Sequence, residues 1–185
     1  MLYETKEFTL KDSRKAVLMN PGDDEAQGLV DYLHKSCGET DFLARVPSEC
    51  DRYTVEKEKE LLNYMKGSDN DLFLCCKVEG KVAGNCHLMM NDKYKMKHRA
   101  NVAIALLREY WNLGIGTMMF EEMFRVAKEA RPDLVQLELE VAEPNTRARA
   151  LYEKMGFVEY GRRENALRSA VDGSFMAEVL MMKKL

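Results

Sequence analysis

The sequence predicts a protein of the α/β (α+β) class, in which a central, mixed and twisted sheet of about seven strands carries helices on both faces. Three observations lead to this prediction. Some segments alternate apolar and polar residues, as LVQLELEVA (134–142) does, which is typical of strands. Others repeat apolar residues at the spacing of a helix, as residues 115–127 do. The predicted order is a β-hairpin, two helices, three strands, a helix, a strand, a helix and two strands, which needs layers of both kinds.

The first half of the chain is expected to form a hairpin, two helices and a second hairpin. Two short apolar runs around KDSR within residues 5–20 predict the first hairpin. Apolar residues at helical spacing over 23–36 follow an acidic start, which suits the positive end of a helix dipole. After a polar connection, Thr54 is the expected N-cap of the next helix. The dipeptide EG divides two apolar runs within 70–92, which predicts the second hairpin.

The second half is expected to alternate strands with two helices. The first of these helices follows a stretch with two glycines, and Pro132 ends it. Asn145 is the expected N-cap of a short helix that runs to Met155, and Gly156 ends this helix. The remaining predicted strands cover 100–107, 134–142, 157–164 and 175–184.

The bulk properties favour a soluble globular protein that forms one domain over residues 1–185. The net charge of −3 argues against a dedicated nucleic-acid binder. No run approaches the ~20 apolar residues that span a bilayer, and the charged N-terminal segment lacks the apolar region of a signal peptide. The five cysteines include no CxxC motif and do not cluster with the three histidines. We therefore expect buried, reduced thiols in a cytoplasmic protein, with no nucleic acid, membrane or metal as a partner.

The stretch REYWNLGIGTMMFEEMF (108–124) brings Gly114 and Gly116 directly before an apolar helix. Amide N–H groups in the first turn of a helix have no intrahelical partner, so a strand, a glycine-bearing turn and a helix together form an anion site. The alternative is that the glycines only let the helix begin close to a strand. Met119 stands where a dinucleotide fingerprint has its third glycine, and the lysine of a P-loop is absent. A pyrophosphate held mostly by backbone N–H groups fits this pattern best.

Two motifs resemble those of the GNAT superfamily of N-acyltransferases. LLREYWNLGIGTMMFEEM resembles the acyl-CoA-binding signature (Q/R)-x-x-G-x-(G/A), with Trp111 where the pattern has Gln or Arg. LELEVAEPNTRARALYEKMGFVEYGRR resembles the second hallmark, a strand, an Asn and a short helix ending in L-Y-x-x-x-G-F. The predicted element order is also similar to that of the GNAT fold. The resemblance implies an N-acetyltransferase that moves an acetyl group from acetyl-CoA to a primary amine by direct attack through a tetrahedral intermediate.

The resemblance also implies that two backbone segments bind acetyl-CoA, the co-substrate. Residues 112–117 would surround the pyrophosphate with main-chain N–H groups, and the end of the preceding strand would pair with the pantetheine arm as it would with a peptide. An N–H near Leu106 would stabilise the oxyanion. Asn145 matches a family position that contacts pantetheine or helps to separate the two strands, although an N-cap is needed there in any case. The implied binding residues are Ile104, Ala105, Leu106, Asn112, Leu113, Gly114, Ile115, Gly116, Thr117 and Asn145, and no metal is implied.

Tyr152 is the implied general acid. It lies in ALYEKMGF, where the family has a phenol near the sulfur of CoA, and a positioned acid that protonates the departing thiolate contributes typically ~10²–10⁴-fold. The alternative is a core aromatic residue that packs with Leu151 and Met155 on one face of the helix.

Glu140 is the implied general base. Many family members carry an acid on the strand before the glycine loop, but Asn101 occupies that position here and cannot act as a base. The branch that acetylates ribosomal-protein N-termini uses a Glu in LEV…N…LY, and LEVAEPNTRARALY repeats this spacing, with Glu140 twelve residues before Tyr152. The alternatives are a water relay as base and a Glu140 that, like Glu138 on the same side of the strand, is merely solvated.

The acceptor is expected to be a small-molecule amine, a polyamine or a peptide or protein N-terminus, contacted by the N-terminal helices, residues 37–55 and the last hairpin. Acidic residues in the connection would attract a cationic amine, but ordinary loop charges are the favoured interpretation; they are Glu39, Asp41, Glu49 and Asp51. The basic run over 93–99 is interpreted as a solvated hairpin tip, and His87 as a satisfied core residue. A homodimer is compatible with the resemblance. The alternatives to an acetyltransferase are a non-catalytic acyl-CoA-binding module on the same scaffold and a dinucleotide-dependent oxidoreductase.

Overall fold

The computed structural model describes residues 1–185 and contains a mixed sheet of eight strands in the order β1-β2-β3-β4-β5-β6-β8-β7. The strands are β1 (Lys6–Thr9), β2 (Lys15–Met19), β3 (Asp71–Val78), β4 (Lys81–Met90), β5 (Arg99–Leu106), β6 (Gln136–Ala142), β7 (Val158–Arg168) and β8 (Phe175–Lys184). All neighbouring strands are antiparallel except β5 and β6, which are parallel.

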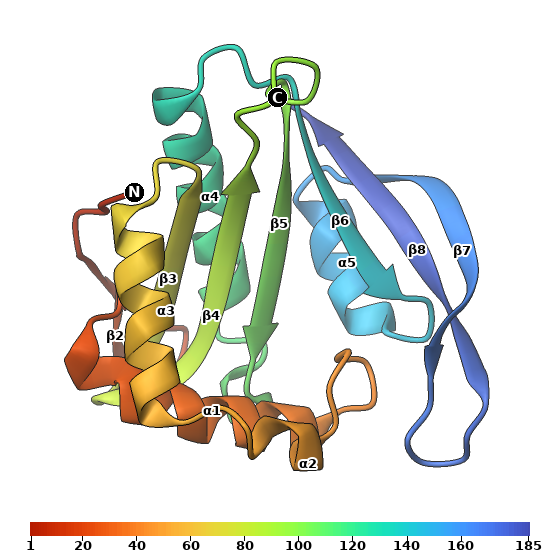
Figure 1. The fold of residues 1–185 in the computed structure, drawn as a ribbon, viewed down its shortest axis with the longest axis horizontal. Helices are drawn as coiled ribbons and strands as arrows, with labels where there is room; N and C mark the ends of the chain where they lie inside the picture. Colours follow the sequence, from red (N-terminus) through yellow and green to blue (C-terminus); the bar gives the residue numbers. More distant parts are fainter.

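The helices cover both faces of this sheet. They are α1 (Ala26–Glu39), α2 (Pro47–Cys50), α3 (Val55–Gly67), α4 (Ile115–Ala130) and α5 (Thr146–Lys154), with 3₁₀ turns at Asp23–Glu25 and Arg108–Tyr110. Figure 1 shows α1 and α3 in front of the sheet and α4 and α5 behind it. The predicted class, a mixed α/β protein with helices on both faces of a central mixed sheet, is confirmed.

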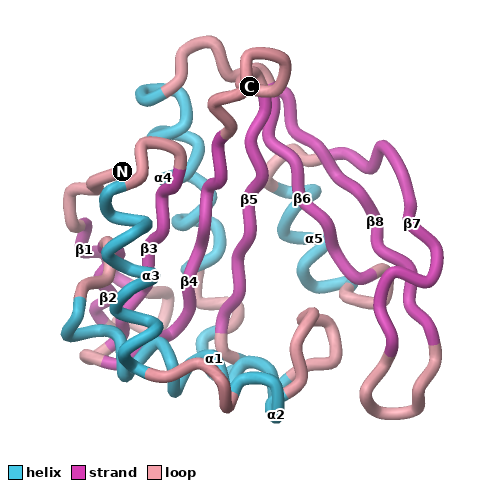
Figure 2. Tube along the Cα trace, viewed as in Figure 1, coloured by secondary structure: helices cyan, strands magenta, loops and turns pink.

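The parallel strands β5 and β6 pair over only a short stretch. Residues 99–101 of β5 align with 136–138 of β6, whereas β5 stays paired with β4 as far as Leu106 and β6 with β8 as far as Ala142. The two strands therefore start side by side and separate toward their carboxyl ends, as Figure 2 shows. Ligands of open sheets bind outside the carboxyl ends of parallel strands, where such a crevice forms.

Both predicted helix N-caps are confirmed. The side chain of Thr54 accepts the N–H of Lys57 at 3.4 Å at the start of α3. Asn145 accepts the N–H of Ala148 at 3.2 Å at the start of α5. Each cap satisfies one of the free N–H groups of the first helical turn, which fixes where the helix begins.

The structure differs from the prediction in the number of strands and in one helix. The sheet has eight strands rather than about seven, although the predicted element order already contains eight, and the hairpin predicted within residues 5–20 is formed by β1 and β2. The expected polar connection after α1 contains α2, which begins at Pro47 and is capped by Glu49, whose carboxylate accepts the N–H of Val46 at 3.1 Å. A four-residue helix is too short to produce a periodic pattern.

The cysteines lie in the core, as expected. All five are buried and unpaired. Burial raises the pKa of the Cys75 and Cys76 thiols to about 12, so both keep their protons at neutral pH. Among the helices, none is both long and apolar enough to cross a bilayer.

Candidate active site

The edge of β5 that β6 leaves free presents backbone groups to the gap between the two strands. The N–H of Leu107 donates to the carbonyl oxygen of Ala83 at 2.9 Å, so the odd-numbered positions at this end of the strand bond to β4. Since alternate residues of a strand bond to opposite neighbours, the backbone groups of Ile104 and Leu106 face the gap.

The side chain of Trp111 binds one of these backbone groups, the carbonyl of Leu106. Its indole Nε1–H donates to the carbonyl oxygen of Leu106 at 2.9 Å. The side chain that departs from the family pattern therefore fixes the connection after β5 to the last residue of the strand. The carbonyl of Leu106 is already bound, and only its N–H is left to face the gap.

The connection between β5 and α4 is a turn that leaves backbone amides without partners at the start of the helix. Asn112 and Gly114 have φ values of 64° and 95°, in the left-handed region that Asn and Gly tolerate best. The N–H of Met118 is the first to bond within α4, to the carbonyl of Gly114 at 3.1 Å. The N–H groups of residues 115–117 therefore have no intrahelical partner, and they stand at the positive end of the 16-residue helix α4.

The two glycines of this turn have different reasons to be glycine. A Cβ at Gly114 would meet no atom within 4 Å, so its positive φ, and not crowding, is what favours glycine there. A Cβ at Gly116 would lie 2.8 Å from Cδ2 of Leu151 in α5. Gly116 thus allows a close approach of α4 to a side chain of α5, a helix rather than the strand of the alternative interpretation, whereas Gly114 leaves space open beside the turn.

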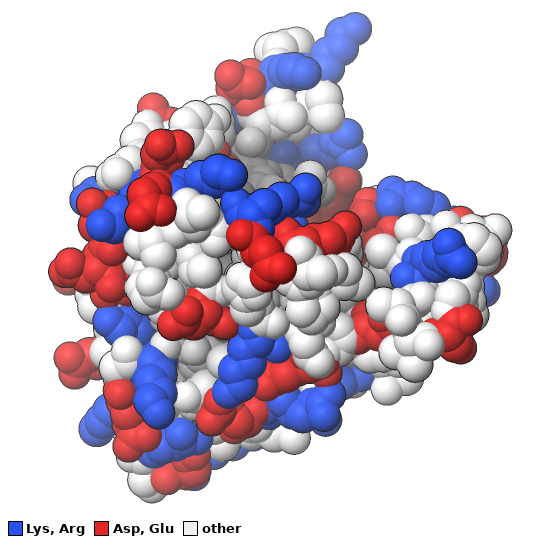
Figure 3. Space-filling view, turned by 60° about the horizontal axis from the view of Figure 1, so that its bottom comes forward, with Lys and Arg blue, Asp and Glu red and all other residues white.

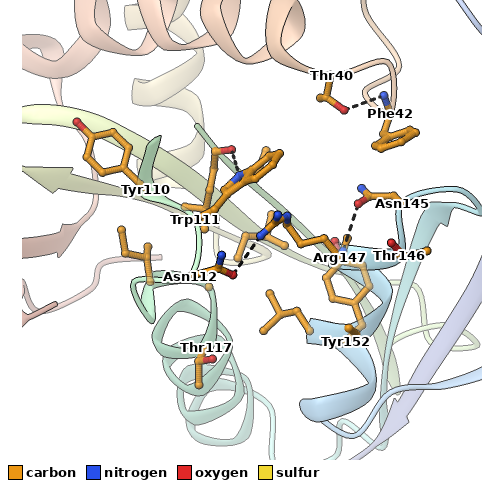
Figure 4. Close-up of a pocket in the computed structure, with 18 of the residues that line it drawn as sticks. Thr40, Phe42, Tyr110, Trp111, Asn112, Thr117, Asn145, Thr146, Arg147 and Tyr152 are labelled. Atoms are coloured by element: carbon orange, nitrogen blue, oxygen red, sulfur yellow. Dashed lines mark hydrogen bonds between the residues drawn. The ribbon is translucent and has the colours of Figure 1, made fainter. Parts of the chain in front are cut away.

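One cavity of about 760 Å³ lies between these segments. Its lining includes ten of the twelve predicted site residues: Ile104, Ala105, Leu106, Asn112, Gly114, Ile115, Gly116, Thr117, Asn145 and Tyr152. Figure 4 shows that the turn after β5 and the start of α5 face each other across it. Leu113 and Glu140 are not among the lining residues. The carbonyl of Leu113 instead accepts the N–H of Lys11 at 3.3 Å, which ties the turn to the β1–β2 hairpin.

Tyr152 is both a core residue and a cavity residue. Its ring packs against Phe120 and Phe157, with centroids 5.6 and 6.3 Å away, and its side chain lines the cavity on the α5 side. Only 7% of the residue is exposed, and this burial raises the pKa of the phenol to about 12. At neutral pH the hydroxyl is therefore protonated and can donate a hydrogen bond into the cavity.

Glu140 lies outside the lining of this cavity. Leu139 and Val141 on either side of it are buried, whereas Glu140 is exposed on the opposite face of β6. Its carboxylate is bound by Arg163 of β7, which also contacts Glu178 of β8. The structure thus brings together the predicted acid and all the predicted binding residues except Leu113 in one cavity, and leaves the predicted base outside its lining.

The cavity carries an excess of positive charge. Lys11, Arg147 and Lys154 line it, and none of them has a carboxylate within 4.0 Å. Glu39, the acidic residue of the lining, has its carboxylate bound to the backbone N–H of Arg108 at 2.6 Å. In contrast, Figure 3 shows acidic and basic side chains interspersed over the face that carries α1 and α2. An anion would be attracted to the cavity by the unpaired cations.

The connection after α1 packs against the last hairpin. The carboxylate of Asp41 accepts the N–H of Ala170 at 2.9 Å, and a second cavity of about 580 Å³ lies between residues 37–47 and 166–171. The other acidic residues of this connection also have local partners: Glu49 caps α2, and Asp51 lies 3.8 Å from Nδ1 of His34. These contacts agree with the interpretation of the four acids as ordinary loop charges.

The remaining polar features singled out in the sequence lie outside the cavity. Lys97 and Arg99 of the basic run pair with Asp133 and Glu138 at 2.9 and 3.0 Å. Nε2 of His87 lies 2.7 Å from the carboxylate of Asp71. No group of three or more His, Cys, Asp or Glu side chains is arranged so that it could hold a metal ion.

Three basic lining residues were not singled out in the sequence, Lys11, Arg147 and Lys154, whereas Thr40 and Phe42 fall within residues 37–55, which were expected to contact the acceptor. Arg147 is two residues beyond the predicted N-cap Asn145, and this position in the first turn of α5 was the available signal. The lining by Lys11, Thr40 and Phe42 depends on how distant segments pack, which no local motif encodes.

Comparisons with known proteins agree with this geometry. Residues 40–157 match the model of the acetyltransferase (GNAT) family. An acetyltransferase of the GNAT family from Streptococcus pneumoniae has a TM-score of 0.82 and 29% identity, over 92% of this chain and 99% of that one. The ribosomal-protein-S5-alanine acetyltransferase from Vibrio fischeri has a TM-score of 0.79 and 15% identity, over 97% and 96% of the two chains.

A third similar structure is that of RimJ from Mycobacterium smegmatis in complex with CoA-disulfide, with a TM-score of 0.73 and 16% identity, over 98% of this chain and 87% of that one. Among curated protein sequences, none matches this chain. At these low identities, RimJ and the Vibrio fischeri enzyme share the fold with this chain.

Proposed function

Because the chain belongs to the acetyltransferase (GNAT) family, we propose that it transfers an acetyl group from acetyl-CoA to a primary amine, by direct attack of the amine through a tetrahedral intermediate. One observation carries this proposal: the free edge of β5, the backbone turn before α4 and the phenol of Tyr152 line a single cavity. Binding, oxyanion stabilisation and proton donation are thus available around one space.

The nucleotide end of acetyl-CoA fits the turn before α4. The N–H groups of residues 115–117 lack intrahelical partners, and the helix dipole adds partial positive charge at the same place. Lys11, Arg147 and Lys154 add full charges to the lining. A pyrophosphate bound there would replace water on donors that the fold leaves free.

The pantetheine arm fits the edge of β5. Its amides can pair with the backbone groups of Ile104 and Leu106 much as a peptide adds to a strand edge. Since Trp111 already binds the carbonyl of Leu106, we infer that the Leu106 N–H is the group that polarises the thioester carbonyl and binds the oxyanion.

Tyr152 is the proposed general acid. Breakdown of the intermediate breaks the carbon–sulfur bond, and the thiolate that leaves takes up a proton. A phenol whose pKa is about 12 keeps its proton at neutral pH and donates a hydrogen bond to the sulfur as charge develops there. The packing of the Tyr152 ring against Phe120 and Phe157 supports this role, because it holds the hydroxyl in one position.

Glu140 is the proposed base, directly or through a relay of water, which takes the proton that the attacking amine loses. It is a carboxylate on the strand that borders the gap, and its exposure leaves it accessible to water. The acceptor class that we propose is a small-molecule amine or a peptide or protein N-terminus, entering between the connection after α1 and the β7–β8 hairpin, where the second cavity lies.

Two linked measurements test the proposal. Acetyl-CoA should raise the melting temperature of the protein and NAD should not, and free thiol should be released from acetyl-CoA only when an amine is present. The amine panel should contain spermidine, amino-acid amides and short peptides with free N-termini. Stabilisation without thiol release across the panel would favour a non-catalytic acyl-CoA-binding module, and stabilisation by NAD alone would favour an oxidoreductase.

A further inference from the structure

Trp111 and Arg147 meet across the cavity from two different elements. Trp111 belongs to the connection after β5, and Arg147 to the first turn of α5. The carbon at the centre of the guanidinium lies 4.2 Å from the centroid of the indole ring, and Nη1 donates to Oδ1 of Asn112 at 3.0 Å. Figure 4 shows the Arg147 side chain extended from α5 to this turn.

The position of the indole ring is itself fixed. Nε1 of Trp111 is held by the carbonyl of Leu106 at 2.9 Å, at the end of β5. The ring therefore offers a planar surface of constant orientation, on which a planar guanidinium stacks favourably. With the guanidinium carbon over the ring, Nη1–H still donates to Oδ1 of Asn112, so N–H groups of the guanidinium remain available as donors.

The charge of Arg147 is not neutralised by the protein. Its hydrogen-bond acceptor is the neutral amide oxygen of Asn112, and no carboxylate lies within 4.0 Å. Two other exposed or partly exposed arginines near the gap do have such partners, Arg149 with Glu159 and Arg163 with Glu140. Arg147 thus keeps an uncompensated charge beside Asn112, which lies in the turn before α4.

We propose that Arg147 binds a phosphate group of the nucleotide half of acyl-CoA, and that Trp111 is the positioning residue that holds the guanidinium at the phosphate. This inference rests on the proposed acetyl-CoA-dependent function. A phosphate accepts two parallel hydrogen bonds from a guanidinium and carries full charge, so it replaces the neutral acceptor of Asn112. Phosphate binding then requires only that Nη1 leaves Asn112, while the contact with Trp111 persists.

The experiment compares the affinities of three ligands by isothermal titration calorimetry: CoA, dephospho-CoA and pantetheine, which has no phosphate. Arg147→Gln should raise the Kd for CoA at least about tenfold, the loss expected for a hydrogen bond to a charged group, and should leave the Kd for pantetheine unchanged. Arg147→Lys should recover part of the loss. An equal loss for CoA and dephospho-CoA identifies the pyrophosphate, and a loss for CoA alone identifies the 3′-phosphate; both results support the proposal.

Arg52→Gln is the matched control. Arg52 also stacks on an aromatic ring, 5.4 Å from the centroid of Tyr53, but it does not line the cavity. Its substitution should leave all three Kd values unchanged. Trp111→Leu should raise the Kd for CoA as Arg147→Gln does. The double variant should lose less binding free energy for CoA than the two single variants lose together, since the two residues act as one unit.

The inference is overturned if Arg147→Gln binds CoA as tightly as the wild type does, or if the affinities for CoA and pantetheine fall by the same factor, which a purely structural role would cause. The melting temperature of each variant, measured without ligand, separates loss of folding from loss of binding. If the wild type itself binds no CoA, the proposed function fails together with this inference. If the wild type binds CoA and Arg147→Gln binds it equally, only this inference fails.

Discussion

The guanidinium of Arg163 forms two hydrogen bonds with the carboxylate of Glu140, from Nη2 to Oε1 at 2.9 Å and from Nη1 to Oε2 at 3.1 Å. Glu138, two residues earlier on the same side of β6, is bound by Nη1 of Arg99, at 3.0 and 3.2 Å. The strand therefore carries two arginine-bound glutamates on one side, a largely buried Glu138 and an exposed Glu140, of which we propose Glu140 as the general base.

The pair provides a matched test of the base. Glu140→Gln should lower kcat at least about tenfold, because the amide cannot take a proton from the attacking amine, whereas Glu138→Gln should leave kcat close to that of the wild type. Steady-state thiol release at saturating acetyl-CoA measures both. Equal rates for the two variants and the wild type would remove Glu140 from the mechanism and leave a relay of water as the base.

Tyr152→Phe tests the general acid. The substitution keeps the ring that packs against Phe120 and Phe157 and removes only the hydroxyl. We expect kcat to fall at least about tenfold, with little change in the Kd for acetyl-CoA, because the hydroxyl acts on the leaving sulfur. Tyr64→Phe, on the exposed surface of α3, is the control. An unaltered kcat for Tyr152→Phe would assign Tyr152 to the core alone.

The raised pKa of Tyr152 also predicts how stability changes at alkaline pH. The folded protein keeps the phenolic proton up to a pKa of about 12, whereas an unfolded tyrosine loses it near pH 10. Between these values the unfolded state binds fewer protons, so the free energy of unfolding falls as the pH rises. At pH ~11 the loss of the phenolic proton in the unfolded state should lower the free energy of unfolding of the wild type by about 1 kcal/mol relative to that of Tyr152→Phe.

Urea unfolding of both proteins at pH ~9 and pH ~11 measures this difference, with the other titrating groups common to the two. The stability gap between wild type and Tyr152→Phe should narrow at the higher pH. A gap that stays constant would mean that the phenol titrates at its ordinary pKa and is in free contact with water.

Gly114→Val should weaken acetyl-CoA binding at least about tenfold, because the new side chain enters the open space beside the turn. The left-handed backbone should also cost about 1–2 kcal/mol of stability. Gly80→Val is a close control: Gly80 has a φ of 81°, a Cβ there would also meet nothing within 4 Å, and it lies in the β3–β4 turn outside the cavity lining. It should lose similar stability without any change in the Kd for acetyl-CoA. Unchanged binding by Gly114→Val would contradict the pyrophosphate assignment.

Gly116→Val should behave differently from Gly114→Val. Its Cβ would lie 2.8 Å from Cδ2 of Leu151 in α5, so the Leu151 side chain has to move out of the space that it fills between α5 and the turn. We therefore expect a lower melting temperature and weaker acetyl-CoA binding together. Thermal unfolding with and without ligand separates the two glycines, and a Gly116→Val protein as stable as the wild type would show that this close approach is not needed.

The elements that could be predicted from the sequence are those with long, regular patterns. The 16 residues of α4 and the alternating residues of β6 each carry several periods of their pattern, and their caps and breakers are local. The element that was missed, α2, has four residues. Its existence depends on the helix it packs against, α1, and not on its own residues.

In the candidate site, too, the local features were predictable from the sequence and the long-range contacts were not. Its backbone part was predictable, because a positive φ, an N-cap and free helix amides follow from a few consecutive residues around Gly114 and Asn145. Its side-chain contacts were not. The stack of Arg147 on Trp111 joins two elements far apart in the sequence, and the partner of Glu140 depends on the register of β7 beside β8, which aligns Arg163 with Glu178.

The structure of the protein bound to CoA tests the central claim most directly, namely that the separated ends of β5 and β6 form an acyl-CoA site. The account predicts the pyrophosphate within hydrogen-bond distance of the N–H groups of residues 115–117, the pantetheine along Ile104 and Leu106, and the sulfur within hydrogen-bond distance of the Tyr152 hydroxyl. A CoA molecule bound anywhere else, or one in this cavity whose sulfur lies out of reach of Tyr152, would contradict it.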